Sequence, residues 1–109
     1  MIDDSAQVID LMGKLEAQLP IPATPTSATV KQLRVQGLKL GAGRVLFIQR
    51  VFYGGDEGGI MCDVTPTKDA KSVLVISLTH LRVTPSHPLS RDIRAYQQQR
   101  IRRIAQSNR

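Results

Sequence analysis

The stretch "GRVLFIQRVFYGGDEGGIMCDVT", residues 43–65, contains two apolar runs separated by a cluster of four glycines. Runs rich in β-branched and aromatic residues predict strands. Both alternating faces of the first run, residues 43–53, are partly apolar. We therefore expect a strand that is central, or that bends enough to serve two sides of a barrel. Glycines supply the positive φ angles of tight hairpins, so the stretch predicts a central β-hairpin.

The glycine cluster invites comparison with a phosphate-binding loop. Such loops lie between a strand and a helix, where backbone N–H groups and the helix dipole meet the anion. This cluster lies between two expected strands, and Asp56 and Glu57 within it repel phosphate. We interpret it as a hairpin tip. An alternative is a ligand-contacting tip in which Tyr53, Asp56 and Glu57 meet a cationic group.

Further strand patterns flank the hairpin on both sides. On its C-terminal side, "SVLVISL", residues 72–78, predicts a buried strand and "LRV", residues 81–83, a short one. On its N-terminal side, residues 30–40 alternate through Leu33 and Val35 and shift phase at Gly37. A glycine at a phase shift indicates a bulge or a bend. Several short strands within one small domain favour a small barrel over a sandwich.

The segment "VLVISLTHLRV", residues 73–83, resembles the end of a Src-homology-3-like or Tudor-type barrel, where one 3₁₀ turn joins the last two strands. The resemblance covers roughly residues 30–84 and implies a strongly curved, five-stranded antiparallel barrel. The aromatic cage of Tudor-type barrels has no counterpart beyond Phe52 and Tyr53, so their ligands do not carry over. The whole chain also resembles small uncharacterised proteins of bacterial mobile elements, such as integron cassettes and plasmids.

Helical patterns are expected at both ends of the barrel. Residues 4–19 carry Val8, Leu11 and Leu15 on one stripe, which predicts an amphipathic helix. Residues 20–29, with three prolines, are interpreted as an extended linker. Residues 86–106 predict a basic helix. We therefore expect a single α+β domain over residues 1–109, a barrel with a helix at each end.

Charge is distributed unevenly along the chain. The formal net charge is +6, yet residues 1–18 carry −3 and residues 90–109 carry +5. A concentrated basic segment points to an anionic partner. We expect a non-catalytic module that binds DNA or RNA phosphates without reading sequence, because no helix-turn-helix precedes the basic helix. The candidate contacts are Arg91, Arg94, Arg100, Arg102 and Arg103, with Lys39, Arg44 and Arg50.

A second hypothesis is a protein-interaction role. Acidic residues 3–16 can attract the basic tail, either within one chain or between two copies in a homodimer or adaptor.

An enzyme is the third hypothesis, and it rests on Cys62 with His80. Cys62 lies in the middle of an expected strand, where a thiol is inert. No closely spaced pair among Cys62, His80 and His87 prepares a metal site, so we expect no catalytic residue, metal or cofactor. The single cysteine, the acidic start "MIDDS" and the lack of a long apolar run favour the cytoplasm and no membrane contact.

Overall fold

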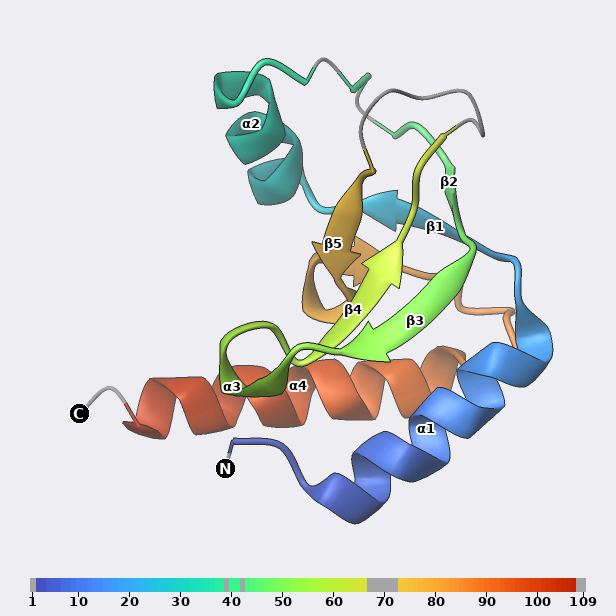
Figure 1. Ribbon diagram of the computed structural model, residues 1–109, viewed down its shortest axis with the longest axis vertical. Helices are drawn as coiled ribbons and strands as arrows, with labels where there is room; N and C mark the ends of the chain where they lie inside the picture. Colours follow the sequence, from blue (N-terminus) through green and yellow to red (C-terminus); the bar gives the residue numbers. More distant parts are fainter. Residues whose placement is uncertain (1, 39, 42, 67–72, 108–109) are drawn as a thin grey trace.

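The computed structural model describes residues 2–38, 40–41, 43–66 and 73–107 of the chain (Figure 1). These residues form two three-stranded antiparallel sheets. The first sheet has the order β2 (Leu46–Ile48), β1 (Ile21–Pro25), β6 (Leu81–Arg82), and the second has the order β3 (Arg50–Tyr53), β4 (Ile60–Asp63), β5 (Val75–Ser77). The helices are α1 (Ser5–Gln18), α2 (Ser27–Val35), α3 (Gly55–Gly58), α4 (Ser90–Ser107) and the 3₁₀ helix η1 (Leu78–His80).

The α+β class is confirmed, but the closed five-stranded barrel is wrong, because the strands form two separate sheets that do not close. The expected long strand over residues 43–53 is divided at Gln49. Leu46 and Ile48 are buried before this point, whereas Val51 and Tyr53 are the half-buried residues after it. The inward face therefore changes at Gln49, which sends β2 into one sheet and β3 into the other.

The central hairpin is confirmed. Strands β3 and β4 pair from Arg50↔Asp63 to Tyr53↔Ile60, and the single turn of α3 joins them. The Gly54 N–H donates to the Gly59 carbonyl at 2.7 Å and closes the tip. The tight step after β5 is also present, because η1 connects β5 directly to β6.

The proline-rich linker predicted for residues 20–29 is wrong, because this segment contains β1, the middle strand of its sheet. Its burial alternates, with Ile21, Ala23 and Pro25 facing inward. Prolines lock an extended backbone that a strand can use, but they lack the N–H that a middle strand normally needs. The pairing pattern explains why they are tolerated here.

The backbone nitrogen of each proline in β1 points toward a neighbouring strand at a position where that strand does not pair with β1. The Thr26 N–H just after β1 donates to the His80 carbonyl at 3.0 Å, so even-numbered residues of β1 face β6 and odd-numbered ones face β2. Pro22 thus faces β6, which pairs only with residues 24–25. Pro25 faces β2, which pairs only with residues 21–23. Neither proline removes a hydrogen bond from the sheet.

The strand predicted over residues 30–40 is also wrong, because residues 27–35 form α2. Thr26 caps this helix by accepting from the Thr29 N–H at 3.4 Å. The buried residues Thr29, Val30 and Leu33 follow helical spacing, whereas Val35, the residue that completed the alternating pattern, is 89% exposed. Periodicity over so few residues did not distinguish the two structures.

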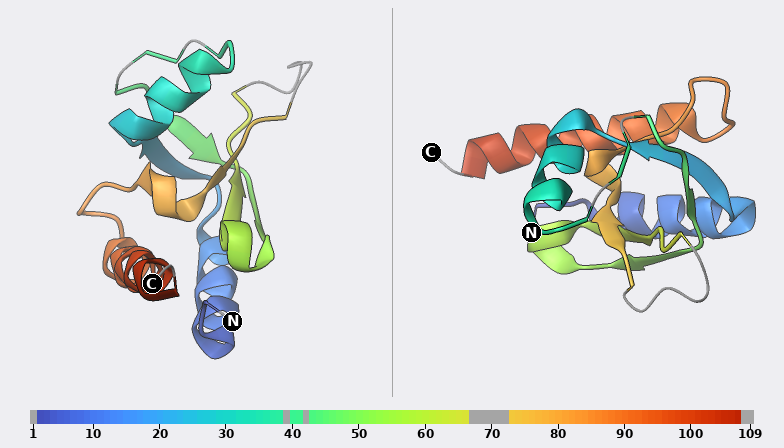
Figure 2. Two further views of the ribbon diagram at one scale, coloured as in Figure 1. Left: turned by 90° about the vertical axis from the view of Figure 1, so that its left-hand side faces the viewer. Right: turned by 90° about the horizontal axis from the view of Figure 1, so that it is seen from above.

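The two terminal helices were predicted, with shifted ends for the second. α1 begins after Asp4, whose carboxylate accepts from the Gln7 N–H at 3.0 Å, and it buries Val8, Leu11 and Leu15. α4 begins at Ser90 rather than near residue 86, because residues 84–89 form turns. Figures 1 and 2 show α1 and α4 together at one end of the molecule, with α2 at the opposite end.

Candidate functional site

The arginines of α4 divide into an inward and an outward group. At about 3.6 residues per turn, Arg100 lies on the same side of the helix as Ile93 and Tyr96. All three are buried, and Arg100 is only 3% exposed. Arg91, Arg94 and Arg102 lie on the opposite, exposed side. The two groups have different surroundings and therefore different roles.

Arg100 belongs to a buried ion pair. Its Nη1 lies 3.1 Å from both carboxylate oxygens of Asp3, and its Nη2 donates to the Asp56 carbonyl at 2.6 Å. Asp3 is 5% exposed, so the two charges are removed from water together. A buried pair of this kind needs further hydrogen bonds to offset its desolvation. Arg100 cannot reach an external phosphate in the folded protein, so it leaves the set of candidate contacts.

Two tyrosines complete the hydrogen bonding of Asp3. The hydroxyls of Tyr53 and Tyr96 donate to Asp3 Oδ2 at 3.0 and 3.2 Å, and the Tyr96 oxygen also accepts the Ile60 N–H at 2.9 Å. Burial raises the pKa of the Tyr96 hydroxyl well above its usual range. Burial, followed by the hydrogen bond to Asp3, also raises the pKa of Tyr53. Both hydroxyls therefore stay protonated and remain donors at neutral pH.

The glycine-rich tip contacts this same cluster, which we call the terminal clamp (Asp3, Tyr53, Asp56, Tyr96 and Arg100). Asp56 Oδ1 accepts the Ile2 N–H at 2.9 Å. Two of the three residues predicted to meet a partner at the tip, Tyr53 and Asp56, are therefore engaged by the chain's own N-terminal segment. The third, Glu57, is exposed and forms no ion pair within the described residues.

Gly59 lies against the terminal clamp. A Cβ at this position would overlap the Tyr96 hydroxyl and lie 2.9 Å from Arg100 Nε. Its backbone has φ +66° and ψ −142°, a region that only glycine adopts readily. The glycine therefore serves the close approach of α4 to the hairpin tip, which supports the structural interpretation of the loop.

The two ends of the chain contact each other within one molecule, through charged and polar groups. Besides Asp3 and Arg100, Arg103 donates from Nη1 to the Ile2 carbonyl at 2.9 Å. Lys14 on α1 lies 3.3 Å from the Asp92 carboxylate on α4. Intramolecular contacts thus occupy Arg100 and Arg103 and fix α4 beside α1.

The outward arginines remain accessible. Arg91, Arg94 and Arg102 form no ion pair with any carboxylate in the described part of the chain. The carboxylate of Asp92, on the same helix, is bound by Lys14. The outer face of α4, defined by Arg91, Arg94, Gln98 and Arg102, is therefore an exposed surface of uncompensated positive charge.

The remaining predicted contacts come from other elements. Arg50 begins β3 and lies 3.5 Å from the Asp63 carboxylate, with its own side chain 72% exposed. Arg44 is exposed in the segment before β2. Lys39 lies outside the described residues. The structure thus groups three of the eight predicted contacts, Arg91, Arg94 and Arg102, on one face.

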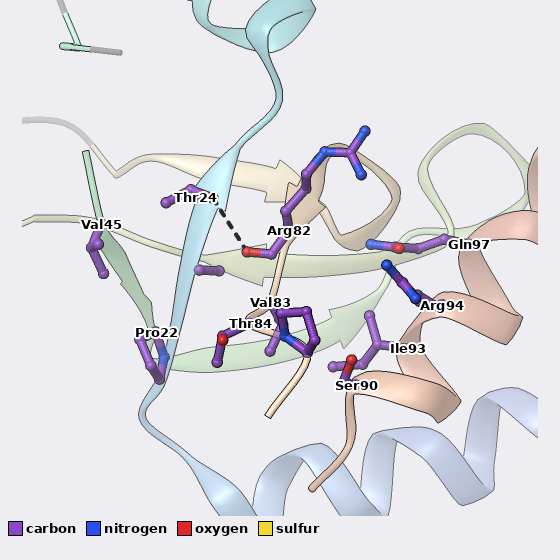
Figure 3. Close-up of a pocket in the computed structure, with 12 residues that line it drawn as sticks. Pro22, Thr24, Val45, Arg82, Val83, Thr84, Ser90, Ile93, Arg94 and Gln97 are labelled. Atoms are coloured by element: carbon purple, nitrogen blue, oxygen red, sulfur yellow. Dashed lines mark hydrogen bonds between the residues drawn. The ribbon is translucent and has the colours of Figure 1, made fainter. Parts of the chain in front are cut away.

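A groove beside α4 was not predicted from the sequence. It has a volume of about 380 Å³ and lies between the outer side of the β2-β1-β6 sheet and α4 (Figure 3). Arg94 of α4 and Arg82 of β6 both line it. Its position depends on β1 being a strand, so a linker interpretation of residues 20–29 could not locate it.

The residues considered for catalysis or metal binding lie in different surroundings. Cys62 is fully buried, and this burial raises its pKa to about 12, so the thiol stays protonated at neutral pH. His80 is exposed at the end of η1, and His87 Nδ1 accepts the Leu89 N–H at 3.0 Å. Across residues 2–38, 40–41, 43–66 and 73–107, no three His, Cys, Asp or Glu side chains gather as metal ligands.

Comparison of the chain with protein-family models, with curated proteins and with solved structures found no match. Within the described residues, no helix combines the length and the apolar character needed to cross a bilayer. The geometry of α4 and of its adjoining groove therefore carries the functional argument.

Proposed function

We propose that this protein is a non-catalytic module that binds the phosphate backbone of DNA or RNA through the outer face of α4. The observation that carries the proposal is the exposure of Arg91, Arg94 and Arg102 on one side of the helix, without a carboxylate partner in the described chain. Guanidinium groups bind phosphate oxygens through two parallel hydrogen bonds, which favours them for this task.

The spacing of the three arginines suits an extended polyanion. Arg102 lies eleven positions after Arg91, which is about 16 Å along a helix axis at 1.5 Å per residue. Gln98 lies between them and adds a neutral hydrogen-bonding group to the same face. A strand running along α4 meets several positive charges in succession, which favours binding by charge rather than by base reading.

The terminal clamp supports the proposal by fixing the helix. Arg100 and Arg103 hold α4 against the N-terminal residues and the hairpin tip from its inner side. The outer arginines are therefore presented on a helix that is already in place, which limits the ordering cost of binding to their side chains.

Two observations on Cys62 extend the proposal. The first favours binding rather than catalysis, and the second favours an intracellular setting. The buried, protonated Cys62 lacks the exposed, low-pKa environment of a nucleophile. A single free cysteine suits a reducing compartment, so we assign the protein to the cytoplasm as part of this proposal.

The test is fluorescence anisotropy with labelled 20-nucleotide single-stranded DNA, duplex DNA and RNA of mixed sequence, over a range of KCl concentrations. We expect affinity to fall steeply with salt and to depend little on sequence. The variant R91E/R102E should weaken binding to every probe. It should also reduce the slope of log K against log [KCl] by about 2, one per lost phosphate contact.

The matched control is K31E/R34E, which makes the same change in charge on α2. Lys31 and Arg34 are exposed, and α2 lies at the far end of the molecule from α4 (Figure 2). The proposal requires this control to retain most of the affinity. Equal losses in both double variants would show that only net charge matters, and no binding at low salt would remove the proposal altogether.

A further inference from the structure

The groove beside α4 has an apolar floor. Side chains from β1, the residue just before β2, the connection after β6 and α4 form it, and they come from segments far apart in the sequence (Figure 3). The apolar members are Pro22, Ala23, Val45, Val83, Pro85 and Ile93. Val45 remains 52% exposed, so an apolar surface is left open to solvent. A concave apolar surface of this size has room for an aliphatic side chain of a ligand.

Positive charge borders this floor. Arg82 comes from β6 and Arg94 from α4, and both side chains are exposed (Figure 3). Neither forms an ion pair within the described residues, and no aspartate or glutamate lines the groove. Charge complementarity therefore calls for a ligand that carries carboxylates close to an apolar group.

The backbone at the groove offers a hydrogen-bonding edge. Arg82 pairs with Thr24 across the sheet, so by alternation the N–H and carbonyl of Val83 face away from β1. Neither group makes a hydrogen bond with another described residue. On the same edge, the Leu81 carbonyl accepts from Gln97 Nε2 at 2.7 Å, which shows that this edge faces α4. An extended peptide can pair with Val83 there.

We propose that this groove binds an extended acidic peptide segment, with an aliphatic side chain on the apolar floor and carboxylates against Arg82 and Arg94. This goes beyond the proposed nucleic-acid function. A nucleic-acid base is a poorer occupant, because the floor is aliphatic and offers no aromatic side chain for stacking. Arg94 belongs to both surfaces, so the peptide and the nucleic acid compete at high occupancy.

The test is fluorescence polarisation with a labelled peptide in which one leucine is flanked by two glutamates between glycine–serine ends. Two matched peptides replace the glutamates by glutamines or the leucine by serine. We expect each replacement to weaken binding roughly fivefold or more, as for the loss of charge-assisted contacts or of a buried aliphatic group. Binding that ignores either replacement contradicts the proposal.

Protein variants separate this groove from the outer face of α4. V45E and R82E should each weaken peptide binding roughly fivefold or more, because they place negative charge in the groove. R91E changes a residue that does not line the groove, and it should lower oligonucleotide affinity more than peptide affinity. Circular dichroism melts of V45E and R82E confirm that the exposed substitutions leave the fold intact.

Two outcomes would assign the groove to a different occupant and overturn the proposal. The first is that R82E and V45E abolish oligonucleotide binding while peptide binding is unchanged. The second is that sedimentation shows a dimer of the wild type that V45E dissociates, which identifies a second copy of the chain as the occupant. A monomer that binds the acidic peptide through Arg82 and Val45 supports it.

Discussion

The inner and outer faces of α4 show how one residue type takes two roles on one helix. Arg94 and Arg100 are only six residues apart, yet one is exposed at the groove and the other is 3% exposed in an ion pair. The difference comes from the N-terminal segment, which places Asp3 against the inner face. Local sequence sets the charge of the helix, but a distant segment decides which charges remain available for a ligand.

The largest effect should follow from removing the buried charge. R100M leaves the Asp3 carboxylate buried without its counter-charge, and we expect a loss of about 3–5 kcal/mol in the free energy of unfolding. Urea denaturation followed by circular dichroism measures it. The matched control R102M on the outer face should change stability by less than about 0.5 kcal/mol. Similar losses in the two variants would mean that the two faces do not differ as described.

A smaller effect should follow from crowding the terminal clamp. G59A imposes a backbone conformation that costs about 1–3 kcal/mol for a non-glycine residue, and its methyl group displaces the Tyr96 hydroxyl. Thermal melts measure the loss. G13A is the matched control, because nothing lies within 4 Å of its added Cβ on α1. It should stabilise the protein by about 0.5–1 kcal/mol through helix propensity. A neutral G59A would show that α4 does not need this close approach.

The smallest effect concerns an ion pair outside the clamp. Hydrogen bonds from the Thr65 hydroxyl and N–H, at 2.6 and 3.0 Å, and the nearby Arg50 lower the pKa of Asp63. A lowered folded-state pKa gives stability that is present above the unfolded-state pKa, about 4, and is lost as pH falls through the folded-state value. The free energy of unfolding of the wild type should therefore exceed that of D63N by about 1 kcal/mol at pH 7. Urea titrations should show the gap closing as the pH falls below the unfolded-state pKa of about 4, and a gap independent of pH would exclude this account.

Sequence patterns predicted the elements whose signals are local. α1, the β3–β4 hairpin and α4 follow from helical spacing, glycine placement and alternation within one segment. The sequence patterns did not predict β1 or α2. For β1, the tolerance of Pro22 and Pro25 depends on which sides of the strand are paired. Closure of a barrel also depends on the backbone at Gln49, where the inward face changes.

The sequence predicted that α4 carries a concentration of positive charge, but not which of its arginines face inward and which face outward. Arg100 lies four residues after Tyr96 and seven after Ile93, so its place on the apolar stripe of α4 was a signal that it faces inward. Only the contact between Asp3 and Arg100 in the structure shows that the arginine is buried in an ion pair. Arg82 and the groove had no local signal, because four separate segments build the floor.

The terminal clamp also has a consequence for the order of events during synthesis. Asp3 leaves the ribosome long before its guanidinium partner, which follows 97 residues later. Until then the carboxylate lacks its counter-charge, and α1 lacks α4, one of the two elements on which it packs. Closing so long a loop carries the largest entropic cost of any contact in the clamp. The contacts between the N-terminal segment and α4 therefore cannot form before α4 is translated, and a nascent chain halted before Arg100 lacks the ion pair of the terminal clamp.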